Sequence, residues 1–226
     1  MRHPLMPLLL FVFCTPALAV TKYGHGEGGS LRPYTGRSQS IRLIRENIRI
    51  TFSPDSTKYD VLTDYLFINE GANCMAQMFI PVSTGGLDDN KSDLGGLRIT
   101  ADGSHMPAKR EVLRSPVESS GFFYDVKWIT KVAFKSQQKR HVRVRYRSNL
   151  AGSCGESLFY ILAGNRWRGR VGETKLLLVS ASAKEERSAS YSRGGEHSKG
   201  IRFDRKHNNA YSRWRNWNPA GAFHAY

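Results

Sequence analysis

Alternation of apolar and polar residues with a period of two runs through most of this chain and limits its fold more than any other feature. Between Tyr59 and Phe67 every second residue is apolar, apart from Thr63. In residues 139–148, Val142 and its apolar neighbours alternate with basic side chains. Successive side chains of a β-strand point to opposite faces, so the pattern predicts half-buried strands.

Strand patterns recur at intervals of about ten residues, which is typical of an antiparallel β-sandwich. They cover residues 41–52, 58–69, 74–82, 97–106, 122–134, 139–148, 157–164 and 174–181. No stretch shows a helical period with caps. We expect a single all-β domain over residues 41–226. Residues 20–40 are rich in Gly and Ser and without periodicity, which predicts a flexible leader.

The N-terminus has the pattern of a secretory signal peptide. Arg2 precedes an apolar run of about ten residues, and Ala17-Leu18-Ala19 is a small-x-small cleavage site. The run is too short to span a bilayer, and no later stretch is long enough either. The sequence therefore predicts an exported protein, periplasmic or secreted, cleaved near Ala19 and without a transmembrane segment in the mature chain.

Two cysteines, Cys74 and Cys154, remain after cleavage. In an oxidising compartment a disulfide between them is expected. Closing a loop of this length would stabilise the fold by about 4 kcal/mol. The alternative is a reactive thiol at Cys154, which has glycines close by on both sides.

The charge is strongly basic, +15 at pH 7 for the whole chain, of which the signal peptide contributes only Arg2. Such a field favours anionic partners. Outside the cytoplasm these are lipopolysaccharide, phospholipid head groups, cell-wall polymers and extracellular DNA. No nucleic-acid-binding motif accompanies the charge, so a sequence-specific reader is not expected. The alternative is a basic protein whose charge binds nothing specific.

An arginine ladder is predicted on one face of residues 139–148, formed by Arg143, Arg145 and Arg147. Like charges this close repel each other. They call for acidic side chains on a neighbouring strand or for an external anion, and the planar guanidinium suits phosphate and carboxylate. A solvated outer face, or charges that discourage edge pairing of sheets, is the competing interpretation.

Tryptophans concentrate in "GNRWRGRVG", which contains Trp167, and in "SRWRNWNP", which contains Trp214 and Trp217. We expect these rings to close the core, because large amphipathic rings at strand corners often do so. A stacking platform made with Arg213 and Arg215, which could bind an anion or stack on bases or sugars, is the alternative.

Catalytic and metal-binding motifs are absent from the sequence. It contains no H-E-x-x-H, no C-x-x-C and no G-x-S-x-G, and its acidic residues are scattered. We therefore nominate no catalytic residue, metal ligand or cofactor, and we expect a protein that is not an enzyme.

Four segments together resemble a family of secreted bacterial domains of unknown function with an immunoglobulin-like β-sandwich. They are "DYLFINEG", "VAFKSQQKRHVRVRYRSN", "FYILAGNRWRGRVGETKLLLVSA" and "NAYSRWRNWNPAGAFHAY". The family motifs map onto Tyr65, Phe67, Asn69, Pro81, Tyr146, Tyr160, Leu162, Gly164, Trp167, Gly169, Gly172, Trp214 and Pro219. The resemblance spans residues 41–226 and implies a secreted immunoglobulin-like sandwich without a known reaction. The chain departs from the motifs at "CMAQMFIP" and in its two cysteines.

These observations favour an exported, non-enzymatic β-sandwich protein that contacts anionic envelope material or a partner protein. Two alternatives come from other classes: a small envelope hydrolase with dispersed catalytic residues, and a structural subunit of a surface assembly joined through a strand edge.

Overall fold

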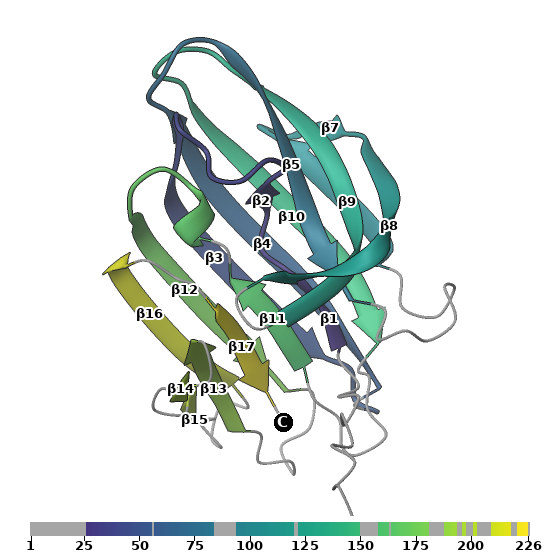
Figure 1. The fold of residues 1–226 in the computed structure, drawn as a ribbon. Coiled ribbons are helices and arrows are strands. Elements are labelled where there is room, and N and C mark those ends of the chain that lie inside the picture. Colours follow the sequence, from purple (N-terminus) through teal and green to yellow (C-terminus); the bar gives the residue numbers. More distant parts are fainter. Residues whose placement is uncertain are drawn as a thin grey trace, which may run out of the picture.

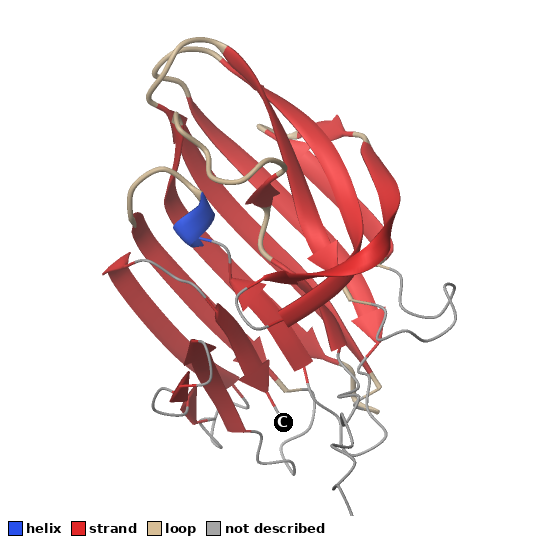
Figure 2. Ribbon diagram, viewed as in Figure 1, coloured by secondary structure: helices blue, strands red, loops and turns tan. Residues whose placement is uncertain are grey.

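The described part of the chain consists almost entirely of β-strands (Figure 2). The computed structural model describes residues 26–55, 57–83, 94–119, 122–149, 158–162, 164–180, 188–193, 196–197, 201–202, 209–217 and 221–225. Its described helix is one 3-10 turn, η1, at Gly164–Arg166. The prediction of an all-β protein is confirmed. In this part of the chain no helix has the length and apolar character to cross a membrane.

The larger sheet has seven strands in the order β16-β12-β3-β4-β10-β6-β7. Their bounds are Ile41–Phe52 (β3), Lys58–Asn69 (β4), Gly95–Ala101 (β6), Ser104–Met106 (β7), Lys139–Asn149 (β10), Val171–Val179 (β12) and Asn209–Trp217 (β16). Neighbouring strands are antiparallel except β12 and β3, which are parallel.

Two smaller sheets lie in front of the seven-stranded sheet, so the molecule has two β layers (Figure 1). One comprises Arg32–Pro33 (β2), Cys74–Val82 (β5), Ala108–Ser119 (β8) and Phe122–Phe134 (β9). The other comprises Gly26–Gly29 (β1), Leu158–Leu162 (β11), Ser188–Arg193 (β13), Glu196–His197 (β14), Ile201–Arg202 (β15) and Gly221–Ala225 (β17).

The core lies between the layers and is filled by the alternating apolar side chains of the long strands. In β4, every second residue from Tyr59 to Asn69 is buried while the residues between them are half-buried. The same alternation gives β10 a buried face with Val142, Val144 and Tyr146. The other face of these two strands therefore points away from the second layer.

A break in the alternation runs across three neighbouring strands of the large sheet. The pairing of β3 with β4 shifts between Leu43 and Arg45, so Ile44 is an extra residue. Directly beside it in β12, a side chain on Gly172 would place its Cβ 2.6 Å from the carbonyl oxygen of Ile44. Asn216 of β16 has a φ of 46°. A strict period of two over residues 41–52 predicts that Ile44 shares a face with Ile48, and this prediction is wrong because the bulge shifts the alternation between them.

Residues 28–33 are buried, and Gly26–Gly29 pair with β11, so the prediction of a flexible leader is wrong for residues 26–33. Leu31 is fully buried, and its amide N–H donates to the Tyr65 hydroxyl oxygen at 3.0 Å. A Cβ on Gly28 would lie 2.2 Å from the hydroxyl oxygen of Tyr146. The glycines of this segment thus allow close packing and do not indicate flexibility. Residues 20–25 of the predicted leader, and the predicted signal peptide, lie outside the described residues.

Candidate anion-binding face

The outer face of the seven-stranded sheet, which points away from the second layer, is rich in basic side chains. Among six neighbouring strands, the strand register places them on five, and three acidic side chains accompany them. The basic residues are Arg42, Arg45, Arg49, Arg98, Lys139, Arg143, Arg145, Arg147, Lys175, Arg213 and Arg215, and the acidic residues are Asp60, Asp64 and Glu173. Positive charge is therefore in large surplus on this face.

Two arginines of the predicted ladder are neutralised by the neighbouring strand. Arg143 lies opposite Asp64 of β4 and donates to its Oδ1 at 2.6 Å. Arg147 lies opposite Asp60 and donates to both of its carboxylate oxygens, at 3.0 and 2.7 Å. The hydrogen bond that each arginine donates to its carboxylate raises the pKa of that arginine. These exposed pairs contribute little to stability, but they consume two of the three ladder charges.

Arg213 and Arg215 of β16 share one carboxylate, that of Glu173 on β12. Lys175 approaches the same group at 3.4 Å. Burial pushes the pKa of Glu173 up, but the hydrogen bonds and charges of Arg213 and Lys175 hold it below its ordinary value. One acid thus faces three bases, and positive charge remains at this edge of the sheet.

Arg145, the middle arginine of the ladder, has no such partner. Register places it beside Leu62 of β4 on one side and opposite Arg98 of β6 on the other. Arg49 of β3 flanks Leu62 from the far side. Arg49, Arg98 and Arg145 are exposed, and within the part of the chain that the structure describes none of the three forms an ion pair. We call these three residues the arginine row.

Sequence reasoning did not identify Arg49 and Arg98 as members of this row. Each alternates with buried neighbours in its own strand, Ile48 with Ile50 and Ile99 with Ala101. That alternation showed which way the two side chains point. Their proximity to Arg145 follows from the register between strands, which no local pattern reveals.

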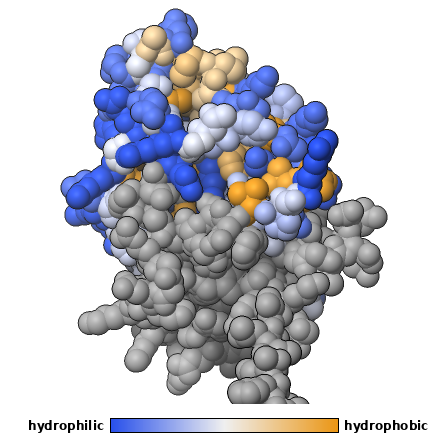
Figure 3. Space-filling model, viewed as in Figure 1, coloured by the Kyte–Doolittle hydropathy of each residue, from blue (hydrophilic) through white to orange (hydrophobic). Residues whose placement is uncertain are grey.

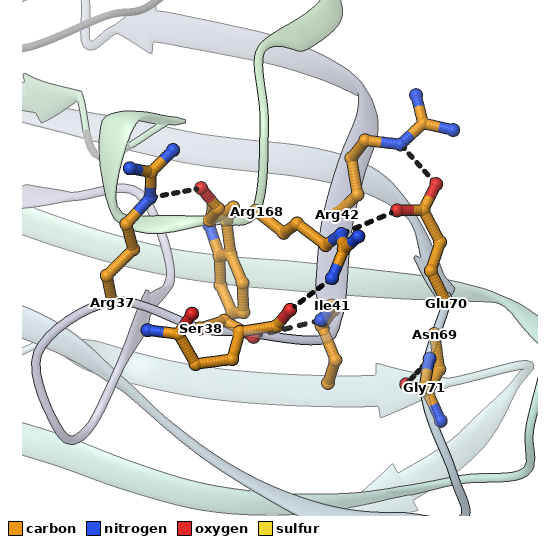
Figure 4. Close-up of polar contacts among 10 residues, drawn as sticks. Arg37, Ser38, Ile41, Arg42, Asn69, Glu70, Gly71 and Arg168 are labelled. Atoms are coloured by element: carbon orange, nitrogen blue, oxygen red, sulfur yellow. Dashed lines mark hydrogen bonds and ion pairs between the residues drawn. The ribbon is translucent and has the colours of Figure 1, made fainter.

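A second group of arginines, close to η1, is structural. Glu70 accepts from Arg42 at 2.7 Å and pairs with Arg168 at 3.0 Å (Figure 4). Arg168 also donates to the carbonyl oxygen of Gln39 at 2.7 Å, and Arg37 donates to that of Trp167 at 3.3 Å. These contacts join the segment before β3 to the turn before β12, so their guanidinium groups are engaged within the fold.

The three nominated tryptophans lie at the core and not on the arginine face. Trp167 is buried, and its indole N–H donates to the carbonyl oxygen of Leu31 at 3.2 Å. Trp214 and Trp217 stack on each other with ring centroids 4.9 Å apart, half-buried against the core. The Trp217 indole N–H donates to Thr174 Oγ1 at 3.0 Å, whereas Arg213 and Arg215 contact Glu173. The structure therefore does not assemble a platform from these rings and arginines.

Cys74 is half-buried at the start of β5 and forms no disulfide with another described residue, and it lines an open depression together with Met75 and Phe134. Cys154 lies outside the described residues, so the disulfide remains a prediction. Among the residues that the structure describes, no group of three or more His, Cys, Asp or Glu side chains could hold a metal ion.

No family model matches this chain, and no curated protein matches its sequence. A similar solved structure is a protein of Legionella pneumophila subsp. pneumophila str. Philadelphia 1 that is provisionally named a nutrient binding protein. It is 14% identical, with a TM-score of 0.65 over 90% of this chain and 72% of that chain. Yeast leukotriene A4 hydrolase with bestatin gives a TM-score of 0.44 at 10% identity, over 83% of this chain and 29% of that chain. The first similarity shows a shared fold; the second supports no argument.

Proposed function

We propose that this chain is an exported, non-enzymatic protein that contacts anionic envelope material through the outer face of its seven-stranded sheet. Export is supported by the signal-peptide pattern of residues 1–19. We further propose that the two β layers form a sandwich of the immunoglobulin-like type. The motif residues Tyr65, Phe67 and Trp167, which are all buried in one core, support this proposal.

The observation that carries the proposal is the surplus of arginine on one regular face. The exposed arginine row has no counter-charge among the described residues, and Glu173 alone serves three bases. A flat sheet face with unpaired guanidinium groups offers planar, multiple hydrogen bonds to phosphate and carboxylate groups. Anionic polymers and lipid head groups present such groups at high density.

Binding of the mature protein to lipid vesicles tests this function. We expect it to sediment with vesicles that contain phosphatidylglycerol, and with purified lipopolysaccharide, but not with pure phosphatidylcholine. Binding should weaken as sodium chloride is added, because salt screens exposed charges beyond about 10 Å at 0.1 M.

A pair of matched variants locates the contact. Arg49→Gln removes one charge from the arginine row and should weaken vesicle binding. Arg114→Gln removes the same charge from an exposed position on β8 in the other layer, and binding should remain close to that of the parent protein. Failure of the parent protein to bind any anionic surface at ordinary salt would refute the proposed function.

A further inference from the structure

We propose that Arg98 and Arg145 form a clamp for one phosphate group, with Arg49 as an additional contact. The inference rests on the proposed function, because it places the ligand on the same face, and it adds the chemistry of that ligand. The shared chemistry is a phosphate group, whether it is free in solution or part of a lipid head group.

The first argument is the direct opposition of two like charges. Arg98 and Arg145 are cross-strand partners in the antiparallel pair of β6 and β10. The Cα atoms of such partners lie about 4.5–5.5 Å apart, and like charges at this distance destabilise a sheet. Their neighbours Arg143 and Arg147 are relieved of this cost by Asp64 and Asp60. A bound anion would provide the same relief for Arg98 and Arg145.

The second argument is a bulge beside the clamp. Arg145 pairs with Arg98, but Arg147 pairs with Gly95, so β6 contains one residue more than β10 over this interval. Gly96, within the bulge, has a φ of 63°, a conformation that favours glycine. Bulges of this kind re-aim a side chain and recur next to functional sites. Arg98 is the second residue after Gly96, so the bulge lies directly beside the clamp.

The third argument concerns the nearest carboxylates. Asp60 and Asp64 flank Leu62 along the outer face of β4, and both are already engaged by ladder arginines. Leu62, which separates Arg145 from Arg49, brings no charge. Two strand spacings place Arg49 about 10 Å from Arg145, within reach for long side chains. The described neighbours on β4 and β3 therefore bring no free negative charge to Arg98 and Arg145.

Phosphate fits this arrangement better than a carboxylate does. Two guanidinium groups carry two positive charges and several N–H donors. A phosphate monoester carries a charge of about −1.5 to −2 and three acceptor oxygens at neutral pH. It can therefore balance both arginines and accept a forked bond from each. A single carboxylate would leave one positive charge in excess.

The sequence contains one intramolecular competitor for the clamp. Asp88, Asp89 and Asp93 precede β6 in residues 84–93, which lie outside the described residues. The test must therefore use the intact mature chain, in which any such competition is present. A phosphate effect that is measured on that protein and is lost when Arg98 or Arg145 is replaced shows that the clamp is open to an external ligand, because general stabilisation by phosphate does not depend on these residues.

Thermal unfolding with added inorganic phosphate tests the clamp. Phosphate should raise the melting temperature of the parent protein more than sodium chloride of equal ionic strength. Arg145→Gln and Arg98→Gln should each weaken phosphate binding about tenfold or more, as expected for the loss of a charge-assisted forked contact. Arg215→Gln removes the same charge from the edge strand of the same face, where Glu173 keeps Arg213 and Lys175 as partners, so this variant should bind phosphate nearly as tightly as the parent.

The melting temperature without phosphate shows whether each variant is folded. In phosphate-free buffer Arg145→Gln should melt at the same temperature as the parent protein or higher, because the substitution removes a like-charge opposition. Arg145→Lys keeps the charge but loses the planar fork, so it should recover only part of the phosphate effect.

Vesicles distinguish the two sources of phosphate. Arg145→Gln should lose more binding to phosphatidic acid, a phosphate monoester, than Arg215→Gln does, if the clamp accepts lipid head groups. No phosphate effect on the parent protein, or equal losses in Arg215→Gln and Arg145→Gln, would overturn the clamp. Vesicle binding without a phosphate effect would support the proposed function and refute the clamp. A phosphate effect without vesicle binding would leave the clamp and refute the function.

Discussion

At the scale of single residues, the carboxyl group of Glu46 is the most unusual group in the core. It is fully buried between the layers, and the Ser30 hydroxyl donates to its Oε1. Burial raises the pKa of Glu46 to about 7, although hydrogen bonds from Ser30 and Thr174 act in the opposite direction. Burial raises the pKa values of the nearby Tyr65 and Tyr160 hydroxyl groups, and a charge on Glu46 would add to this rise. Burial therefore favours the uncharged form of the Glu46 carboxyl group.

Glu46 should make the stability of the protein depend on pH. Because its pKa is higher in the folded chain than in the unfolded chain, its contribution is fully present below the ordinary value of 4.5 and is lost as pH rises to about 7. The free energy of unfolding should fall by about 3 kcal/mol over that interval, since one pKa unit corresponds to 1.36 kcal/mol.

Chemical denaturation at several pH values measures this dependence. Glu46→Gln, which stays neutral and keeps the shape of the side chain, should remove most of the slope between pH 4.5 and 7. An unchanged slope in that variant would assign the pH dependence to other groups.

Asn69 is a motif residue whose role is structural. Its side-chain amide donates to the carbonyl oxygens of Ala72 at 2.7 Å and Lys135 at 3.1 Å, and its Oδ1 accepts from the Gly71 amide at 3.1 Å. It thereby joins the turn after β4 to the turn after β9. Asn69→Ala should cost about 2–3 kcal/mol, because the substitution removes three hydrogen bonds made by a fully buried side chain.

Asn73 provides the matched control for this substitution. It is exposed and makes one bond in the same region, from the Ser136 amide at 2.7 Å. Asn73→Ala should cost about 1 kcal/mol or less. Urea denaturation compares the two variants, and equal losses would contradict the structural role of Asn69.

At the scale of elements, the bulge that crosses β3, β12 and β16 sets which side chains enter the core. On β3 the buried residues lie at odd-numbered positions up to Leu43 and at even-numbered positions from Glu46. On β12 the same change occurs between Val171 and Thr174. Gly172 allows this because only hydrogen fits against the backbone of Ile44. The three strands therefore shift their alternation together.

Gly172→Ala should destabilise the protein by about 1–3 kcal/mol, because its Cβ would lie 2.6 Å from a carbonyl oxygen that the sheet holds in place. Gly95→Ala is the matched control in the same sheet, since its nearest neighbour, the Arg147 carbonyl oxygen, is 3.6 Å away. Thermal unfolding of both variants is the measurement. A similar small loss in each would show that the bulge can relax.

The strands themselves could be predicted from the sequence because their alternation is local. The same rule predicted that Arg143, Arg145 and Arg147 share one face. Of the two kinds of counter-charge considered for them, acidic side chains on a neighbouring strand are present for Arg143 and Arg147, and an external anion stays a proposal. What could not be predicted depends on register between distant strands, namely the Asp60 and Asp64 pairs and the opposition of Arg98 to Arg145. The burial of Leu31 could not be predicted either, because a glycine-rich segment such as residues 20–40 has the composition of a flexible linker.

At the scale of the whole molecule, the chain between Asn149 and Cys154 is too short for the predicted disulfide to Cys74. Cys74 pairs with Phe134, close to the turn that leads into β10 at Lys139. Asn149, the last described residue before Cys154, lies at the other end of β10, about 34 Å along the strand. Five residues of extended chain reach about 18 Å. The described geometry thus favours a free thiol at Cys74 in a single folded chain.

Alkylation of the oxidised, folded protein tests this. We expect iodoacetamide to label Cys74, which lines an open depression, and peptide mass spectrometry to locate the label. A sample reduced in denaturant reports complete labelling for comparison. Protection of Cys74 until reductant is added would show that its sulfur is joined to another, as the sequence alone suggests.

The parallel pairing of β1 with β11 has a consequence for how the chain matures. The first described strand acquires its neighbour only after residues 158–162 have been made, and β17 then completes that neighbour's other edge. Contacts between such distant segments are slow to form. A chain that emerges with its N-terminal side first must keep β1 and the carbonyl group of Leu31 without their partners, β11 and the Trp167 indole, until late in synthesis. In the exported protein that we propose, the same delay would help to keep the polypeptide unfolded while it is threaded through a translocation channel.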